Sequence, residues 1–151
     1  RAEEAMAEMR AAGLEPNAVT YTGLLNAYAD GGGKWELAEA AMKEMRAAGV
    51  EPNVVTYTSL LNAYGKGGGQ WRRAEEAMAE MRAAGLEPNA VTYTGLLNAY
   101  ADGGGKWELA EAAMKEMRAA GVEPNVVTYT SLLNAYGKGG GQWRRAEEAM
   151  A

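Results

Sequence analysis

Apolar residues recur along the chain at helical spacing, in two kinds of stretch that alternate. In the first kind, the apolar side chains stand at i, i+3, i+4 and i+7, on one stripe of a helix: Tyr57, Leu60, Leu61 and Tyr64. In the second kind, from about residue 70 to residue 84, the stripe consists of Trp71, Ala74, Met78 and Met81. The β-branched run at residues 54–56 favours a strand by itself, but the longer helical stripe outweighs it. The pattern therefore predicts pairs of amphipathic helices.

Capping and turn residues mark the ends of both helices. Asn53, after Pro52, is a good N-cap for a first helix of about 13 residues. The glycines at residues 67–69 end that helix and make a turn. The second helix, of about 15 residues, ends before Gly85, where glycine suits a left-handed C-terminal cap. At 1.5 Å per residue, helices of these lengths span roughly 20–22 Å.

The helix pair recurs with a period of 36 residues, as the pentapeptide GLEPN at Gly13 and its variant GVEPN at Gly49 show. Two versions of the repeat alternate, and residues 1–79 are identical to residues 73–151. Such identity points to a designed consensus protein or a very recent duplication. We divide the single array of residues 1–151 into a partial repeat (1–17), three complete repeats (18–53, 54–89 and 90–125) and an incomplete repeat (126–151).

One helix pair cannot bury its own apolar stripe, but stacked copies cover each other. We therefore expect an all-α fold, a superhelical solenoid of helix-turn-helix repeats. Neither end of the sequence carries a polar capping helix, so both ends would expose apolar stripes. Head-to-tail self-association is the expected consequence.

The composition argues against catalysis. The sequence contains no Cys and no His, so it lacks the usual nucleophile, the usual general base and the usual zinc ligands. We expect no catalytic residue, no metal site and no cofactor. No apolar run approaches the roughly 20 residues that span a bilayer, so we expect no membrane partner, and no targeting segment indicates a localisation. The net charge of −5 argues mildly against a nucleic-acid partner.

The repeat resembles the pentatricopeptide repeat, an α-solenoid family. The matching parts are VTYT-LLNAY in the first helix, AEEAM-EM in the second and G-EPN at the close, and they cover essentially the whole chain. The related tetratricopeptide and Sel1-like repeats lack VTYT after such a boundary. This sequence departs from the family by one extra residue in the GGG turn, which would alter the superhelical pitch and leaves the nucleotide spacing open. The resemblance implies a right-handed α-α superhelix, and natural relatives work mainly in mitochondria and chloroplasts.

The resemblance also implies sequence-specific binding of single-stranded RNA, with one nucleotide per repeat along the concave face of the first helices. The second residue of a family unit wedges between bases, which assigns that role to Val19, Val55, Val91 and Val127. The fifth and last residues select the base, which assigns the pairs Thr22 with Asn53, Thr58 with Asn89, and Thr94 with Asn125, and leaves Thr130 unpaired. Thr with Asn is the family's combination for adenine, so the expected partner is an A-rich RNA. In the family, a Lys late in the first helix contacts the RNA phosphates, and Lys66 and Lys138 occupy that position here. The alternate repeats have Asp30 and Asp102 at the same position.

The residues themselves allow two interpretations. A Thr hydroxyl and an Asn amide together can bond the edge of an unpaired base. However, Thr58 near a helix N-terminus can also bond the backbone, and Asn89 is already explained as an N-cap. The alternative function is therefore a structural or protein-binding scaffold with no RNA function of its own. RNA binding requires that the base-selecting threonines face the inner groove and are not enclosed between neighbouring hairpins.

Charge is distributed unevenly over the repeat. Residues 54–64 of the first helix contain no charged residue, whereas the acidic residues lie on second helices and in the EPN turn, where we expect a solvated outer face. The acidic version of the repeat carries Asp30 and Glu36, and the basic version carries Lys66, Arg72 and Arg73. We hypothesise that these opposite charges pair between neighbouring repeats, with under about 1 kcal/mol from each exposed pair.

Overall fold

The computed structural model describes residues 2–140 and 142–150, and within them the regular structure is helical. The helices are α1 (Ala2–Ala11), α2 (Ala18–Asp30), α3 (Trp35–Ala47), α4 (Val54–Lys66), α5 (Trp71–Ala83), α6 (Ala90–Asp102), α7 (Trp107–Ala119), α8 (Val126–Lys138) and α9 (Trp143–Met150). No strand occurs in these described residues. The all-α prediction is confirmed.

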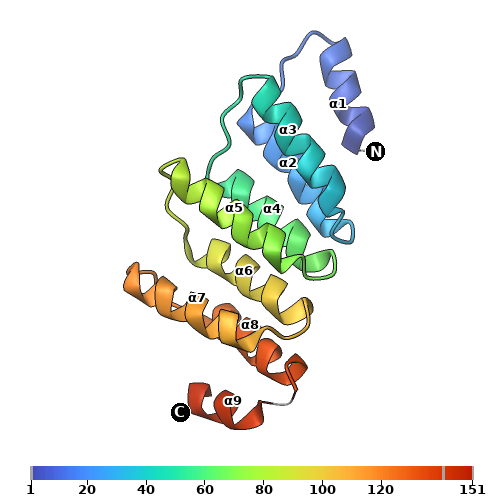
Figure 1. Cartoon of the computed structure of the whole chain (residues 1–151). Helices are drawn as coiled ribbons and strands as arrows, with labels where there is room; N and C mark the ends of the chain where they lie inside the picture. The colour runs from blue at the N-terminus through green and yellow to red at the C-terminus, as the bar shows by residue number, and fades with distance from the viewer. Residues whose placement is uncertain (1, 141, 151) are drawn as a thin grey trace.

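The helices form two layers of a solenoid (Figure 1). The first helices of the repeats, α2, α4, α6 and α8, pack each on the next and form one layer. The second helices α3, α5 and α7 lie in front of them in Figure 1, each packed against the first helix of its own repeat and of the following one. Chain order is thus also spatial order, as expected for stacked repeats that contact only their neighbours. Within the described residues, no helix combines the length and the apolar character that crossing a membrane needs.

The asparagine caps predicted from the sequence start the first helices. Asn53 has an extended backbone, with φ −118° and ψ −176°, and its Oδ1 accepts the backbone N–H of Thr56 at 3.0 Å. The Thr56 hydroxyl in turn accepts the backbone N–H of Asn53 at 3.1 Å. Two N–H groups that the helix itself cannot satisfy are thereby bonded. The same reciprocal cap opens α2, α6 and α8.

The second helices are shorter than predicted, and the difference lies at their ends. Helix α5 comprises 13 residues, and Gln70 and Ala84 flank it rather than belong to it. Gln70 has ψ 65°, which is not helical. After Ala84, the N–H of Gly85 bonds the carbonyl of Arg82 and the N–H of Leu86 bonds that of Met81. This is a Schellman motif with Gly85 at φ +78°, so the predicted glycine cap is confirmed.

A continuous core runs between the layers. The side chains buried completely in each complete repeat include a leucine of the first helix, and an alanine and a methionine of the second: Leu25, Leu61 and Leu97; Ala38, Ala74 and Ala110; Met45, Met81 and Met117. Burial of a leucine or methionine side chain contributes about 1.5–3 kcal/mol. Because these residues belong to the predicted stripes, the core confirms the helical periodicity. The tryptophans Trp35, Trp71 and Trp107 are only half-buried, at the edge of this core.

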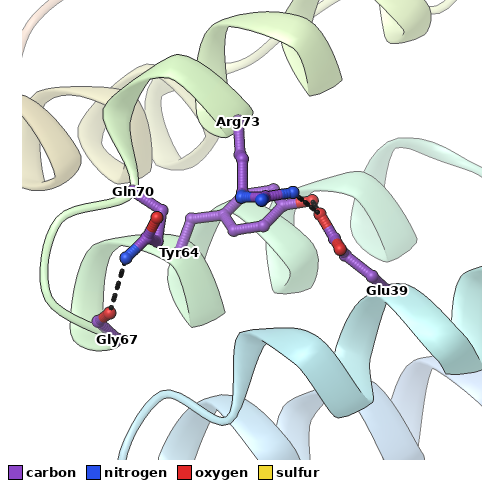
Figure 2. A network of polar contacts seen from close by, with 5 residues as sticks. All are labelled: Glu39, Tyr64, Gly67, Gln70 and Arg73. Atoms are coloured by element: carbon purple, nitrogen blue, oxygen red, sulfur yellow. Dashed lines mark hydrogen bonds and ion pairs between the residues drawn. The ribbon is translucent and has the colours of Figure 1, made fainter.

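Polar contacts on the second-helix side join consecutive repeats (Figure 2). The Tyr64 hydroxyl donates to Glu39 Oε2 at 2.6 Å, and Arg73 Nη1 reaches the same oxygen at 3.3 Å. The Arg73 guanidinium also lies over the Trp35 ring, 4.4 Å from its centroid. Burial, followed by the hydrogen bond to Glu39, raises the pKa of Tyr64 well above its ordinary value. Glu39 was expected on a purely solvated face, but this carboxylate accepts bonds from the next repeat and is partly buried.

Candidate nucleic-acid interface

A row of exposed valines lies on the first turns of the first helices. Val19, Val55, Val91 and Val127 are 79%, 58%, 57% and 59% exposed, although each is the second residue of a helix with a well-buried stripe. Their side chains point away from the stripe that forms the core. We call the surface made by these valines and the N-cap asparagines Asn53, Asn89 and Asn125 the first-helix face. Repeated exposure of large apolar side chains on one surface is typical of an interaction site.

The threonines predicted to select bases lie deeper than the valines. Thr22, Thr58 and Thr94 are only 9%, 8% and 8% exposed, because each contacts the first helix of the following repeat. Their hydroxyl oxygens lie 3.1, 2.9 and 3.2 Å from the hydroxyl oxygens of Thr56, Thr92 and Thr128. Each threonine is therefore buried against the next first helix, and the exposure required for base reading is reduced to 8–9% of its surface. Thr130 is exposed and donates to the Val126 carbonyl at 2.8 Å.

The asparagines predicted as partners are exposed, and they do serve as N-caps. In Asn89, the hydrogen bonds of the cap end on Oδ1, which accepts the backbone N–H and the hydroxyl of Thr92 at 3.0 and 2.9 Å. The cap leaves the two N–H donors of the Asn89 amide for another partner. Capping and base recognition therefore use opposite ends of one side chain, and the two interpretations of this asparagine are compatible.

The structure brings each predicted Thr and Asn together through a third residue. Thr58 bonds Thr92, and Thr92 bonds Asn89, so the predicted pair shares one hydrogen-bonded neighbour. Thr92 and its counterparts Thr56 and Thr128 were not predicted from the sequence as part of the site. The available signal was a Thr three residues after each N-cap asparagine, which is the spacing of a capping box.

The predicted phosphate contacts lie far from these groups. Lys66 is the last residue of α4, 11 residues after Val55 and so about 16 Å further along the helix axis at 1.5 Å per residue. Its ammonium pairs with Asp30 of the preceding repeat at 3.2 Å, and Lys138 pairs with Asp102 at 2.7 Å. These ion pairs are of the kind hypothesised from the alternating charges. They also place a carboxylate beside each predicted phosphate ligand.

Other ion pairs tie acidic residues of the second helices to arginines. Arg10, Arg46 and Arg82 each reach a glutamate of the following second helix: Glu44, Glu80 and Glu116, at 2.5, 3.6 and 3.0 Å. Much of the negative charge is thereby balanced on the second helices. The first-helix face, with its Val and Asn side chains, carries no charge of its own. Among the described residues, no cluster of three or more His, Cys, Asp or Glu could hold a metal ion.

Family models and solved structures resemble this chain over most of its length. The model of the pentatricopeptide repeat domain matches residues 5–67 and 76–139, and a single-repeat model of the same family matches residues 55–86. No curated protein matches the chain. A solved structure of the pentatricopeptide repeat protein PPR10, in complex with an 18-nt psaJ RNA element, is 35% identical, with a TM-score of 0.82.

The chain corresponds to only part of that relative. The match covers 91% of this chain and 20% of the RNA-bound protein. The structure of PPR10 from maize gives a TM-score of 0.57 at 27% identity, over 97% of this chain and 26% of that one. The repeat domain of Arabidopsis thaliana protein-only RNase P 1, solved with tRNA, gives 0.74 at 19% identity, over 99% and 81% of the two chains. This last likeness concerns the fold alone.

Proposed function

Because the chain belongs to the pentatricopeptide repeat family, we propose that its first-helix face binds single-stranded RNA as a module without catalysis of its own. The observation that carries the proposal is the row of four exposed valines on the first helices. In each complete repeat, the chain between one of these valines and the next contains a predicted base-selecting Thr and Asn. A base needs an apolar surface for its ring and hydrogen-bonding groups for its edge. The row offers both at every repeat. PPR10, the 35% identical relative, was solved in complex with an RNA element, which supports the same class of ligand.

We further propose one nucleotide per complete repeat, with a preference for adenine. Each base would enter between two successive valines, such as Val55 and Val91. Its edge would then meet the Asn89 amide at the surface, and Thr58, which is buried against the following first helix, would take part only through the small fraction of its surface that stays exposed. Phosphate contacts would come from Lys66 and Lys138, whose pairing with aspartates predicts weak and salt-sensitive binding.

The proposal is tested by mobility shift with labelled oligo(A), oligo(U), oligo(C) and oligo(G) RNA at low salt. We expect the tightest binding to oligo(A), and loss of that preference in Asn89→Asp. Asp is as good an N-cap as Asn, so this variant keeps α6 capped while it removes the amide donors. Asn17→Asp is the matched control, since it changes the same cap in α2 where no complete predicted pair is present.

Equal affinity for the four RNAs, or no binding to any of them, would refute RNA reading and favour a structural or protein-binding scaffold. The exposed valines would then be the surface to test for protein partners. For a protein of these 151 residues alone, we also propose head-to-tail association. Helix α8 has the sequence of α4 and α2 has that of α6, and α4 packs on α6 within the chain. The same contact between α8 of one copy and α2 of the next would bring α9 and α1, which both carry parts of the α5 sequence, to one place, so one of them must be displaced; light scattering should then show a mass that rises with concentration.

A further inference from the structure

An asparagine lies in the middle of every first helix, on the side opposite to the core. We call these residues the asparagine row: Asn26, Asn62, Asn98 and Asn134. Asn62 follows Val55 by seven residues and precedes Lys66 by four, so these three side chains lie on one line along α4, and the buried stripe with Leu61 lies on the other side. At 1.5 Å per residue, Asn62 is about 10 Å from Val55 along the helix axis, compared with about 16 Å for Lys66.

Two members of the asparagine row contact the following repeat. The Asn26 side chain contacts the Ser59 hydroxyl, and the Asn98 side chain contacts the Ser131 hydroxyl. Each contact uses one hydrogen-bonding position of an amide that has two N–H donors and one carbonyl oxygen. Whichever end of the amide meets the serine, at least one N–H donor is left for a ligand.

Asn62 has no such contact, because the next repeat carries Gly95 at the position of the serine. A Cβ on Gly95 would stand 3.2 Å from Asn62 Oδ1. Among the described residues, none makes a hydrogen bond with the Asn62 side chain, which is half-buried at the surface of α4. Bonding between repeats therefore does not account for this asparagine. Helix stability does not account for it either, since Asn is a poorer helix former than Ala, Lys or Glu.

The proposed orientation of the base brings the RNA backbone to the asparagine row. The base edge meets Asn89, which is the N-cap of α6 and stands at the beginning of the first helices. The Watson–Crick edge of a base faces away from its sugar, so the sugar and the phosphate extend away from the N-caps, along the line from Val55 to Asn62. Phosphate oxygens accept hydrogen bonds, and Asn side chains are among their usual donors.

We propose that the asparagine row binds the phosphates of the RNA, with one amide contact in each repeat. This inference rests on the proposed function and deepens it, because it names a backbone contact that every repeat has. Lysines occur only in alternate repeats, and each of them must give up an aspartate to reach a phosphate. Asparagine occurs in both versions of the repeat, lies nearer to the valines and carries no ion pair.

Asn62→Ala is the variant that tests this contact, because Asn62 bonds no other side chain and Ala favours the helix. The affinity for oligo(A) RNA, measured by mobility shift, should fall about five-fold, the effect of one hydrogen bond. The melting temperature should not fall. The preference for oligo(A) over the other three RNAs and the salt dependence of binding should stay the same, because an amide touches no base in this arrangement and releases no counterion.

Asn62→Lys places a charge where the phosphate is proposed. We expect it to steepen the slope of log K against log salt by about 0.7, the value for one phosphate contact on a single strand. Ala79→Lys is the matched control, because Ala79 is exposed on α5, in the layer of second helices. It adds the same charge away from the asparagine row and should leave the slope unchanged.

The outcomes distinguish this inference from the proposed function. Unchanged affinity in Asn62→Ala, in a chain where Asn89→Asp loses the adenine preference, would overturn the amide contact and leave RNA reading intact. Equal slopes in Asn62→Lys and Ala79→Lys would also overturn it, because no phosphate would then lie beside residue 62. Loss of the adenine preference in Asn62→Ala would assign Asn62 to the base and not to the phosphate. Absence of RNA binding by the unaltered chain would overturn the proposed function and this inference with it.

Discussion

The Gly-rich turns of neighbouring repeats stack so closely that a single methyl group added at the contact should push the two turns apart. A Cβ placed on Gly69 would lie 2.1 Å from the backbone nitrogen of Gly103 and 2.3 Å from the carbonyl carbon of Asp102. Gly33 meets Gly67 in the same way, and Gly105 meets Gly139. The atoms in the way belong to the backbone, so no side-chain rotation can make room. We therefore predict that Gly69→Ala strongly destabilises the array.

The magnitude follows from two contributions. An alanine at the φ of Gly69, +66°, costs about 1–2 kcal/mol as a left-handed residue. Restoring ordinary contact distances of about 3.5 Å requires the two turns to move apart by more than 1 Å, and overpacking of this kind costs about 1–3 kcal/mol. The free energy of unfolding should thus fall by about 2–5 kcal/mol. For a domain of this size, that lowers the melting temperature by about 4–20 °C.

Gly68→Ala is the matched control in the same turn. Gly68 also has a positive φ, +91°, but the nearest atom to its Cβ is the Gln70 side-chain nitrogen at 3.9 Å. Only the backbone strain of about 1–2 kcal/mol should appear there. Urea and thermal unfolding followed by circular dichroism compare the two variants. If Gly69→Ala were no less stable than Gly68→Ala, the close stacking of the turns would not be the source of the destabilisation.

Two further predictions concern charge and pH. Changing Asp30 and Asp102 to Lys should raise RNA affinity, measured by mobility shift. It should also lower the melting temperature slightly, because each exposed ion pair with Lys66 or Lys138 contributes under about 1 kcal/mol. A rise in both the affinity and the melting temperature would contradict the pairing. Burial and the hydrogen bonds to glutamate raise the pKa of Tyr64 and Tyr100 above the unfolded value of about 10, so the unfolded chain loses these protons first. The contribution of these two tyrosines to stability should be constant below about pH 10 and decrease above it. Tyr64→Phe with Tyr100→Phe should make the alkaline fall shallower in a pH series of urea titrations, and an equally steep fall in the double variant would exclude these tyrosines as its cause.

Local features of the fold were predictable because neighbours in sequence cause them. Asn53 caps α4 through a residue three positions away, and the turn at Gly85 ends α5 through bonds that span three and five residues. The stripe with Leu61 is buried because a helix repeats every 3.6 residues. The one-residue excess predicted at each end of α5 has an equally local cause, since Gln70 has a non-helical ψ of 65° and Ala84 is the C-cap residue that precedes the glycine turn.

The candidate site was predictable in position and only partly in geometry. The valines are exposed as their proposed role needs, and the asparagines stand at the surface, because both follow from the register of a capped helix. The enclosure of Thr58 was not predictable, since it depends on Thr92 of the next repeat, 34 residues later. The carboxylate of Glu39 is held by Tyr64 for the same reason, 25 residues away.

The sequence by itself determined where helices begin and end, which stripe is buried and that the chain stacks on itself, since these depend on bonds within a few residues and on a period of 36. Only the tertiary structure decided how closely neighbouring repeats approach. That distance determines which threonines are enclosed, which lysines are paired and which glycines touch. The physical reason is that repeat-to-repeat contacts join residues far apart in the chain, and their geometry depends on the packing of whole helices.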